Sequence, residues 1–276
     1  MPVQPQATPA FEVQPVKPAT TEQADTARIA VNGLRVTGAR AYSEADLVAV
    51  AGFKPGSLMS LTDLRAMAAR ITGHYQRSGH FVAQAYLPTQ DIKDGIVTIA
   101  VIEGQYGKVT LNNQTNVSDS LAHGLLSGIR PGDVVSSAPL ETRLLLLSDV
   151  PGVRVSSSVV PGAEAGSSDL IVNLTPGPRV TGSVDADNAG NRYTGVYRLG
   201  ANVNVNEPLG LGDVASLRVL TAGDGLNFAS VAYQLQVGRS TWGGSYSALT
   251  YELGEEFAAL QAHGTSRVAS VHGSYP

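Results

Sequence analysis

With 276 residues, the chain is long enough for two or three domains, and its net charge of −4 without a basic block argues against a nucleic-acid partner. The absence of cysteine excludes structural disulfides and thiol chemistry. No apolar run approaches the ~20 residues of a membrane-spanning helix, so any membrane segment must be β-structure.

The N-terminal segment, residues 1–27, interleaves proline, alanine, threonine and polar residues. It shows neither the basic start nor the apolar core of a signal peptide. We predict a Pro-rich flexible linker. If the protein is exported, we expect that the numbering starts downstream of the export signal or that the chain is a fragment.

Residues 28–103 predict a small α+β domain with the element order β-α-α-β-β. Hydrophobic residues over 29–36 indicate the first strand. A helix should begin at Ser43, which can cap it, and end at Gly52, which can adopt the left-handed conformation of a helix end.

A second helix in this segment should begin at Ser60 or Thr62 and end near Gly79. The apolar residues that have the spacing of one helical face are Leu64, Met67, Ala68, Ile71 and Tyr75. Two strands follow, at 81–87 and 96–103, and complete the domain.

The same pattern then repeats, which predicts a second domain of the same kind over residues 104–176. The sequence GFKPG at 52–56 corresponds to GIRPG at 128–132. At the same spacing, the helix-core residues Leu64, Ala68 and Ile71 coincide with Leu140, Leu144 and Leu147.

Residues 177–276 contain only strand signals, and we expect an all-β domain there. The predicted strands are 179–187, 194–206, 213–221, 228–237, 240–253 and 264–275. A closed membrane barrel needs at least about eight strands. These six are therefore expected to be the N-terminal part of a transmembrane β-barrel that the chain leaves incomplete.

The strand at 194–206 is the main support for this prediction, because apolar and polar residues alternate along it. Tyr197, Leu199, Ala201, Val203 and Val205 form an apolar phase, and Arg198, Gly200, Asn202, Asn204 and Asn206 form a polar one. The run matches the ~9–11 residues of a membrane strand better than the ~5–6 of a soluble one. The apolar phase should face lipid and the polar phase a wet lumen; a long strand of a soluble sandwich is the alternative.

The residues that we predict to face the lumen are Arg198, Asn202, Asn204 and Arg218. Trp242, Tyr246 and Tyr251 are candidates for an aromatic girdle at a membrane interface, with isolated surface aromatics as the alternative.

Three local motifs resemble the outer-membrane transporters of two-partner secretion, of the haemolysin secretion/activation type. YLPTQDIKDGIVTIAVIEG (86–104) is similar to that family's first POTRA domain. DNAGNRYTG (187–195) and PLGLGD (208–213) are similar to the opening strands of its barrel. No N-terminal plug helix is recognisable, and the later barrel strands are absent from the chain.

The resemblance implies a monomeric translocator in the outer membrane, with its POTRA domains in the periplasm. Its partners would be outer-membrane lipid and a secreted exoprotein with an N-terminal secretion domain, which the barrel conducts without ATP. The competing hypothesis is a non-transporting periplasmic interaction module made of the two POTRA-like domains.

We find no catalytic, cofactor or metal constellation in the sequence, so we predict that the protein is not an enzyme. The GxGxxA string at 210–215 could mark a dinucleotide site, but strand signals flank it and a β-turn is the better reading. Asp185, Asp187 and Asn188 suggest part of a calcium loop, yet the required glycine and glutamate are missing, which favours a turn.

The predicted client site is the strand at 81–87, with Phe81, Val82, Gln84 and Tyr86 as its candidate residues. Pro88 ends this strand, and proline is tolerated at sheet edges. An unfolded client could add to such an edge through its main chain. We expect alanine at Gln84 to change affinity little, and proline at Val82, Gln84 or Tyr86 to weaken binding wherever the amide faces outward.

Overall fold

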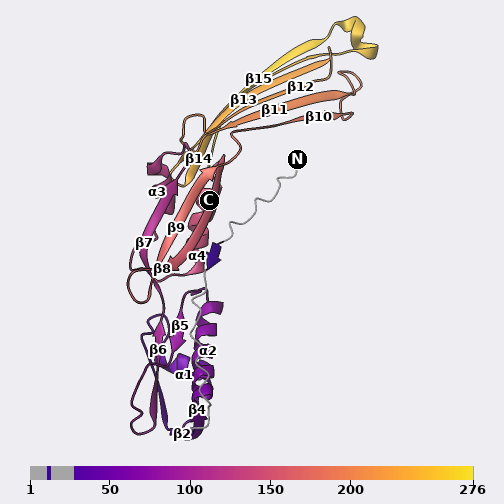
Figure 1. Cartoon of the computed structure of the whole chain (residues 1–276). Helices are drawn as coiled ribbons and strands as arrows, with labels where there is room; N and C mark the ends of the chain where they lie inside the picture. The colour runs from indigo at the N-terminus through magenta and orange to yellow at the C-terminus, as the bar shows by residue number, and fades with distance from the viewer. Residues whose placement is uncertain (1–10, 14–27, 276) are drawn as a thin grey trace.

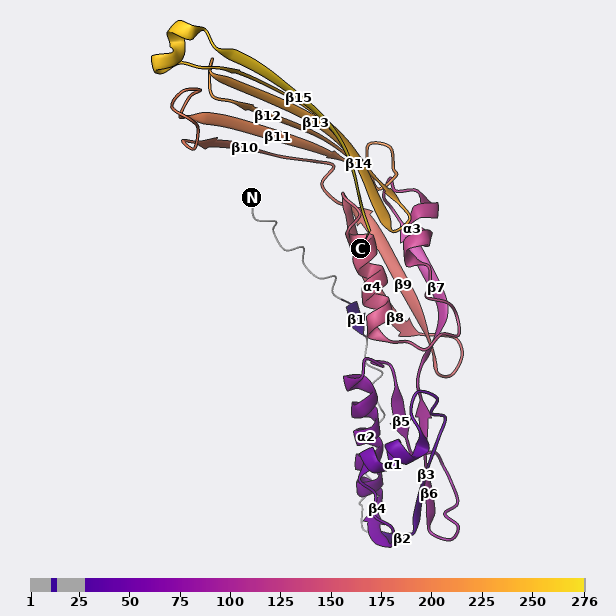
Figure 2. The same cartoon turned by 180° about the vertical axis from the view of Figure 1, so that it is seen from behind.

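The computed structural model describes residues 11–13 and 28–275 of the chain. Two small α+β modules and a six-stranded antiparallel sheet follow one another in space as they do in sequence. The two modules form an elongated arm, and the sheet extends from the end of the second module at an angle (Figures 1 and 2). Within the described residues, no helix combines the length and the apolar character needed to cross a membrane.

The first module contains five strands and two helices. They are β2 (Arg28–Val31), β3 (Gly33–Thr37), α1 (Glu44–Ala51), β4 (Ser57–Ser60), α2 (Leu61–Arg77), β5 (Gln84–Tyr86) and β6 (Ile96–Ile102). The main sheet has the order β3-β6-β5, with β3 parallel and β5 antiparallel to β6. Its core joins both helices to the sheet through residues such as Leu47, Ile71 and Ile99, which are fully buried.

Local chemistry fixes the two helices of this module. The hydroxyl of Ser43 accepts a hydrogen bond from the Asp46 N–H (3.2 Å) at the start of α1, and Gly52 ends that helix with a φ of 69°. Ser60 and Asp63 form a reciprocal capping box at the start of α2. Of the two predicted caps, Ser60 is therefore the one that the structure uses.

Two details of the first module differ from the prediction. The strand expected over 29–36 is split at Asn32, because Asn32 and Gly33 both donate to the Gly95 carbonyl and turn the chain there. The first half, β2, then pairs with β4 in a separate two-stranded sheet that the sequence did not predict.

The second module has the predicted order β-α-α-β-β. Its elements are β7 (Gln105–Asn113), α3 (Asp119–Leu126), α4 (Ser137–Ser148), β8 (Val153–Pro161) and β9 (Ser167–Pro176). Strand β9 lies between β7, to which it is parallel, and β8, to which it is antiparallel. This topology repeats that of the first module, with β7, β9 and β8 in the places of β3, β6 and β5.

A further strand joins the second module from the N-terminal segment. Strand β1 (Phe11–Val13) pairs in parallel with β8, so the complete sheet has the order β1-β8-β9-β7. The predicted linker over 1–27 otherwise lies outside the described residues. At 11–13 the linker prediction is wrong, because the main chain there continues a sheet.

The six-stranded sheet contains the strands that the sequence predicted, with small differences at their ends. They are β10 (Val180–Asp187), β11 (Arg198–Asn206), β12 (Val214–Thr221), β13 (Leu226–Val237), β14 (Ser240–Glu252) and β15 (His263–Ser274), with a short 3-10 helix η1 (Glu255–Leu260) before β15. Each strand pairs antiparallel with the next one in sequence. Within the described residues the sheet is not closed, and β10 and β15 are its edges.

The register of this sheet confirms the alternation that the sequence showed in β11. Asn202 lies opposite Ser183 on one side and Arg218 on the other, and Asn204 lies opposite Thr181 and Ser216. Directly opposed residues share a face of the sheet. Arg198, Asn202, Asn204 and Arg218 therefore lie on one face, whereas Val203 lies on the other, opposite Gly182 and Leu217. That the polar face lines a lumen stays a prediction.

The predicted aromatic girdle is only partly compatible with this register. Trp242 and Tyr246 lie on the apolar face, where Tyr246 is opposite Val231 and Ala269. Tyr251 is an odd number of residues away from Tyr246 and lies on the polar face, opposite Gly264. The prediction that all three rings belong to one aromatic girdle is therefore wrong, because they lie on two different faces of the sheet.

The buried face of α4 offers a matched test of the second module. In a fragment of residues 1–176, Leu140→Ala should lower the free energy of unfolding by about 2–5 kcal/mol, because Leu140 is completely buried in the core cluster. Leu145→Ala, on the same helix but 46% exposed, should change it by less than about 0.5 kcal/mol. Urea unfolding followed by circular dichroism measures both, and equal losses would contradict the assigned face.

Candidate functional site

Strand β5 lies at an edge of the first module, as the sequence predicted, and β6 lies in the centre. In strand β5, Gln84 pairs with Ile102 of β6, Ala85 pairs with Val101, and Tyr86 pairs with Ala100. Ala85 is buried, whereas Gln84 and Tyr86 are exposed on the sheet surface. The outer side of β5 has no further strand within the described residues.

The outward backbone donor of this edge belongs to Ala85. Its N–H donates to the Thr72 hydroxyl of α2 (2.9 Å) and therefore points away from β6. Successive amides of a strand point to opposite sides, so the amides of Gln84 and Tyr86 point toward β6. Proline at either position would break the β5–β6 ladder itself, which corrects the expectation that these amides could report on docking.

Phe81 and Val82 do not belong to the edge strand, contrary to the prediction of a strand over 81–87. The chain turns there, and the Ala83 N–H donates to the His80 carbonyl (3.1 Å). Both side chains are half-buried and pack against the core cluster of the second module. The reason is their position directly after α2, where the chain must reverse before it can enter the sheet.

A groove of about 650 Å³ runs beside β5 between the two modules. Its walls come from Thr72 and Gln76 of α2, from residues 81–84 and from the hairpin that connects β8 and β9. The groove therefore borders the outer edge of β5 and places the second module within reach of any chain that occupies it.

Glu103, directly after β6, connects α2 with the loop after β3 inside the first module. One of its carboxylate oxygens accepts hydrogen bonds from the N–H groups of Arg40 (2.6 Å) and Ala41 (2.7 Å) and from the Tyr75 hydroxyl (2.8 Å). Burial alone would raise the pKa of Glu103, but these bonds hold it below its ordinary value of 4.5. Burial and the same carboxylate raise the pKa of Tyr75. The next residue, Gly104, turns into β7 with a φ of 80°.

Beyond the end of β5, a side chain covers the exposed edge of β6. The Gln90 amide donates to the Thr98 carbonyl (2.7 Å) and accepts from the Thr98 N–H (2.7 Å). It therefore replaces the pair of ladder bonds that another strand residue would make. The sequence showed Gln90 within the motif at 86–104 but gave no signal of this role.

The equivalent edge in the second module is already paired. Strand β8 occupies the same topological position as β5, and β1 covers its outer side, with Phe11 opposite Ser157 and Val13 opposite Val159. Among the residues that the structure describes, β8 thus carries an added strand and the equivalent edge of β5 does not.

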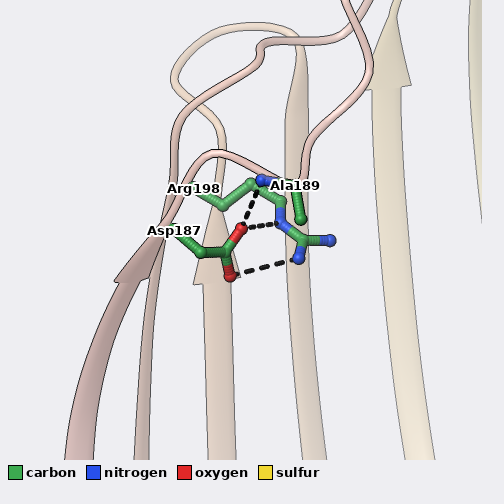
Figure 3. A network of polar contacts seen from close by, with 3 residues as sticks. All are labelled: Asp187, Ala189 and Arg198. Atoms are coloured by element: carbon green, nitrogen blue, oxygen red, sulfur yellow. Dashed lines mark hydrogen bonds and ion pairs between the residues drawn. The ribbon is translucent and has the colours of Figure 1, made fainter.

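On the polar face of the sheet, Arg198 forms an ion pair with Asp187 at the ends of β11 and β10 (Figure 3). The Asp187 Oδ1 atom accepts from Arg198 Nε (2.9 Å) and from the Ala189 N–H (2.9 Å), and Oδ2 accepts from Arg198 Nη2 (3.1 Å). The Ala189 bond closes a turn, which is the reading that the sequence favoured over a calcium loop. Among the described residues, no group of three or more His, Cys, Asp or Glu side chains is arranged to hold a metal ion.

The GxGxxA string at 210–215 also forms a turn. Gly210 and Gly212 have φ values of 75° and 65°, and the strand β12 follows them. A dinucleotide site requires a helix at this point, so the turn reading is confirmed.

Two protein families match this chain. The POTRA domain, ShlB-type, matches residues 29–104, and the haemolysin secretion/activation protein family ShlB/FhaC/HecB matches residues 166–275. The heme/hemopexin transporter protein HuxB of Haemophilus influenzae (strain 86-028NP) is 32% identical over 225 residues, which cover 80% of this chain and 40% of that protein. The outer membrane transporter CdiB of Dickeya dadantii (strain 3937) is 28% identical and covers 70% of this chain and 35% of that protein.

Solved structures show the same fold. CdiB from Escherichia coli superposes with a TM-score of 0.68 at 22% identity, over 94% of this chain and 48% of the other. CdiB from Acinetobacter baumannii gives a TM-score of 0.62 at 22% identity, over 98% and 54%. The chain thus spans about 40% of the length of the curated relative HuxB.

The Glu103 network predicts a pH dependence of stability. Because the folded-state pKa lies below the ordinary 4.5, the stabilisation is fully present above that value and is lost as the pH falls through the lowered pKa. Glu103→Gln in the 1–176 fragment should cost about 1–3 kcal/mol at neutral pH. It should also flatten the loss of stability below about pH 4.5.

Urea unfolding at a series of pH values measures this effect. Glu164→Gln, an exposed carboxylate in the β8–β9 hairpin, is the control and should follow the wild type. An equally steep acid loss in the Glu103→Gln fragment would show that the carboxylate does not carry it.

Proposed function

Because the chain belongs to the haemolysin secretion/activation family of two-partner secretion outer-membrane transporters, we propose that it is part of a polypeptide translocator. In this proposal the two POTRA-like modules lie in the periplasm and capture an unfolded exoprotein through its N-terminal secretion domain. The six-stranded sheet belongs to the barrel through which the exoprotein leaves, without ATP. The protein acts as a monomer.

The observation that carries the capture step is the contrast between β5 and β8. They are equivalent edge strands of a repeated fold, and β8 already holds an added strand through its backbone. This pairing supports the idea that the edge of this fold can accept a short extended segment from a distant part of a chain. Strand β5 offers the corresponding edge, to which no strand of residues 11–13 or 28–275 is added.

Capture at β5 would use the main chain of the client. A client carbonyl would replace the Thr72 hydroxyl as the partner of the Ala85 N–H, and the groove between the modules would take the neighbouring side chains. Gln90 would limit the added strand to β5, because it occupies the next stretch of β6. Backbone pairing of this kind tolerates many client sequences, which suits the export of a long unfolded chain.

The two faces of the sheet support a place in the membrane. The apolar face carries Val203, Leu217 and Val231, which are all between 43% and 53% exposed in this chain. The polar face carries Arg198, Asn202 and Arg218. Contact with lipid suits the apolar face, and contact with water suits the polar face, as in barrels of outer membranes.

Site-specific crosslinking tests capture at β5, and the absence of cysteine from the chain makes the background clean. Gln84→Cys and Tyr86→Cys, each labelled with a photo-crosslinker, should give adducts with the secretion domain of the exoprotein encoded beside this gene. Both side chains are exposed next to the proposed client strand. Mass spectrometry of the adducts then reports the paired client residues.

The control is Arg35→Cys, which is exposed on β3 at the opposite edge of the same sheet. It should give little adduct. Equal yields at both edges, or adducts only from Asn204→Cys on the sheet, would move recognition from β5 to the polar face of the sheet.

Membrane insertion is tested by two neighbouring substitutions in β11, made in a full-length transporter that contains this chain. Val203→Arg should impair assembly, since arginine on the lipid face costs about 2–4 kcal/mol near the bilayer midplane. Asn204→Arg should be tolerated, because it joins the polar face with Arg218. The heat-modifiable band of outer-membrane fractions on denaturing gels measures assembly, and equal effects would refute the assigned faces.

A further inference from the structure

The turn between β11 and β12, residues 207–213, is held together by a buried carboxylate. Asp213 is completely buried, and its carboxylate accepts hydrogen bonds from the N–H groups of Leu209 (3.1 Å) and Leu211 (3.0 Å). It also accepts from the Tyr233 hydroxyl of β13 (2.6 Å). Asp213 therefore has donors for both of its oxygens and fixes the shape of the turn.

This turn is also the contact between the sheet and the second module. The Ser118 N–H, at the start of α3, donates to the Gly210 carbonyl (2.9 Å). A Cβ atom at Gly210 would lie 2.3 Å from the Asn116 carbonyl oxygen, and one at Gly212 would lie 3.1 Å from Leu121. The turn thus lies directly on the second module, and glycine permits the approach.

Glu207 begins the turn and has none of the partners that Asp213 has. Its side chain is only 6% exposed, and within the described residues neither carboxylate oxygen has a hydrogen-bond partner. Its Cγ lies 3.6 Å from the position that a Cβ of Gly152 in the second module would occupy. The side chain is therefore enclosed where the module and the sheet meet.

The environment of Glu207 favours its neutral form. Burial is the main cause that raises its pKa to about 7, the charge of Asp213 adds to the shift, and the nearby Gly212 N–H opposes it. The other titratable group at this turn is Tyr233, which is bound to Asp213. From the second module, Gly152 lies beside Glu207, and Asn116, Ser118 and Leu121 lie against the rest of the turn; none of these four carries a charge.

We propose that the turn 207–213 is a proton-dependent latch, in which a neutral Glu207 holds the second POTRA-like module against the sheet and an ionised Glu207 releases it. An ionised carboxylate whose one nearby donor among the described residues is the Gly212 N–H is costly when buried and gains water when the joint opens. Opening would swing the client-binding arm relative to the barrel without any nucleotide.

The direction of the pH effect follows from the raised pKa. The docked state holds the proton more tightly than the open state, so docking is strongest below the ordinary pKa of 4.5. It weakens as the pH rises from 4.5 toward 7 and stays at its weakest above that. The ratio of docked to open molecules should fall on the order of 100-fold across this range.

Electron–electron distance measurements on the full chain in detergent micelles test the latch. Nitroxide labels at Thr142→Cys on α4 and Asp224→Cys in the turn between β12 and β13 report the angle between module and sheet; both positions are exposed. The wild type should give one narrow distance at about pH 5 and a second, broader population at about pH 8.5. Glu207→Gln, which keeps the neutral shape, should give the narrow distance at both.

Glu252→Gln, an exposed carboxylate on β14, is the control and should keep the pH dependence of the wild type. Three results would overturn the proposal: no pH dependence in the wild type, the same dependence in Glu207→Gln, or a broad distribution of that variant at both pH values. The last result would mean that docking of the module requires the negative charge of Glu207. If Glu207→Gln does not fold, Glu207→Ala takes its place, and an absence of pH dependence in the wild type overturns the proposal by itself.

Discussion

Unpaired backbone groups at sheet edges are the constraint on which the rest of this structure depends. An edge strand presents N–H and C=O groups that need partners, and three edge stretches in the two modules are treated differently. A hydroxyl from Thr72 serves the outer amide of β5, the amide of Gln90 serves the backbone of Thr98, and a whole strand, β1, covers β8. A single side-chain hydroxyl is the easiest of these to displace, which is why β5 is the edge that we assign to the client.

Two buried glutamates show how donors decide the behaviour of a buried carboxylate. Glu103 lies inside the first module and Glu207 lies where the second module meets the sheet, and the two are equally inaccessible, at 6% exposure each. Glu103 accepts two backbone N–H bonds and one hydroxyl, and its pKa is lowered. Glu207 accepts none within the described residues, and its pKa is raised to about 7. The first module therefore holds a charged carboxylate in its interior, whereas in our proposal the contact between the second module and the sheet is firmest when the carboxyl of Glu207 is neutral.

The separation of the six-stranded sheet into a polar and an apolar face depends on the register of its strands. From β10 to β15 the described ladders pair residue for residue without a shift, so a polar position in β11 remains on the polar face across the neighbouring strands. A shift by one residue would exchange the two faces. The same rule separates Tyr251 from Trp242 and Tyr246, which the sequence had grouped by residue type alone.

The sequence by itself determined the repeat, the helices and the six strands, because these depend on local periodicity and on capping residues such as Ser43 and Ser60. It also determined the two faces of β11, since alternation along one strand needs no knowledge of its neighbours. Tertiary structure alone decided which partners the exposed groups find. Thr72 and Ala85, Gln90 and Thr98, and β1 and β8 are joined by contacts that have no periodic signal, and Glu207 is buried where its turn meets the second module, a distant part of the chain. Such pairings depend on how the finished elements pack against one another, and a pattern read along one segment cannot contain that information.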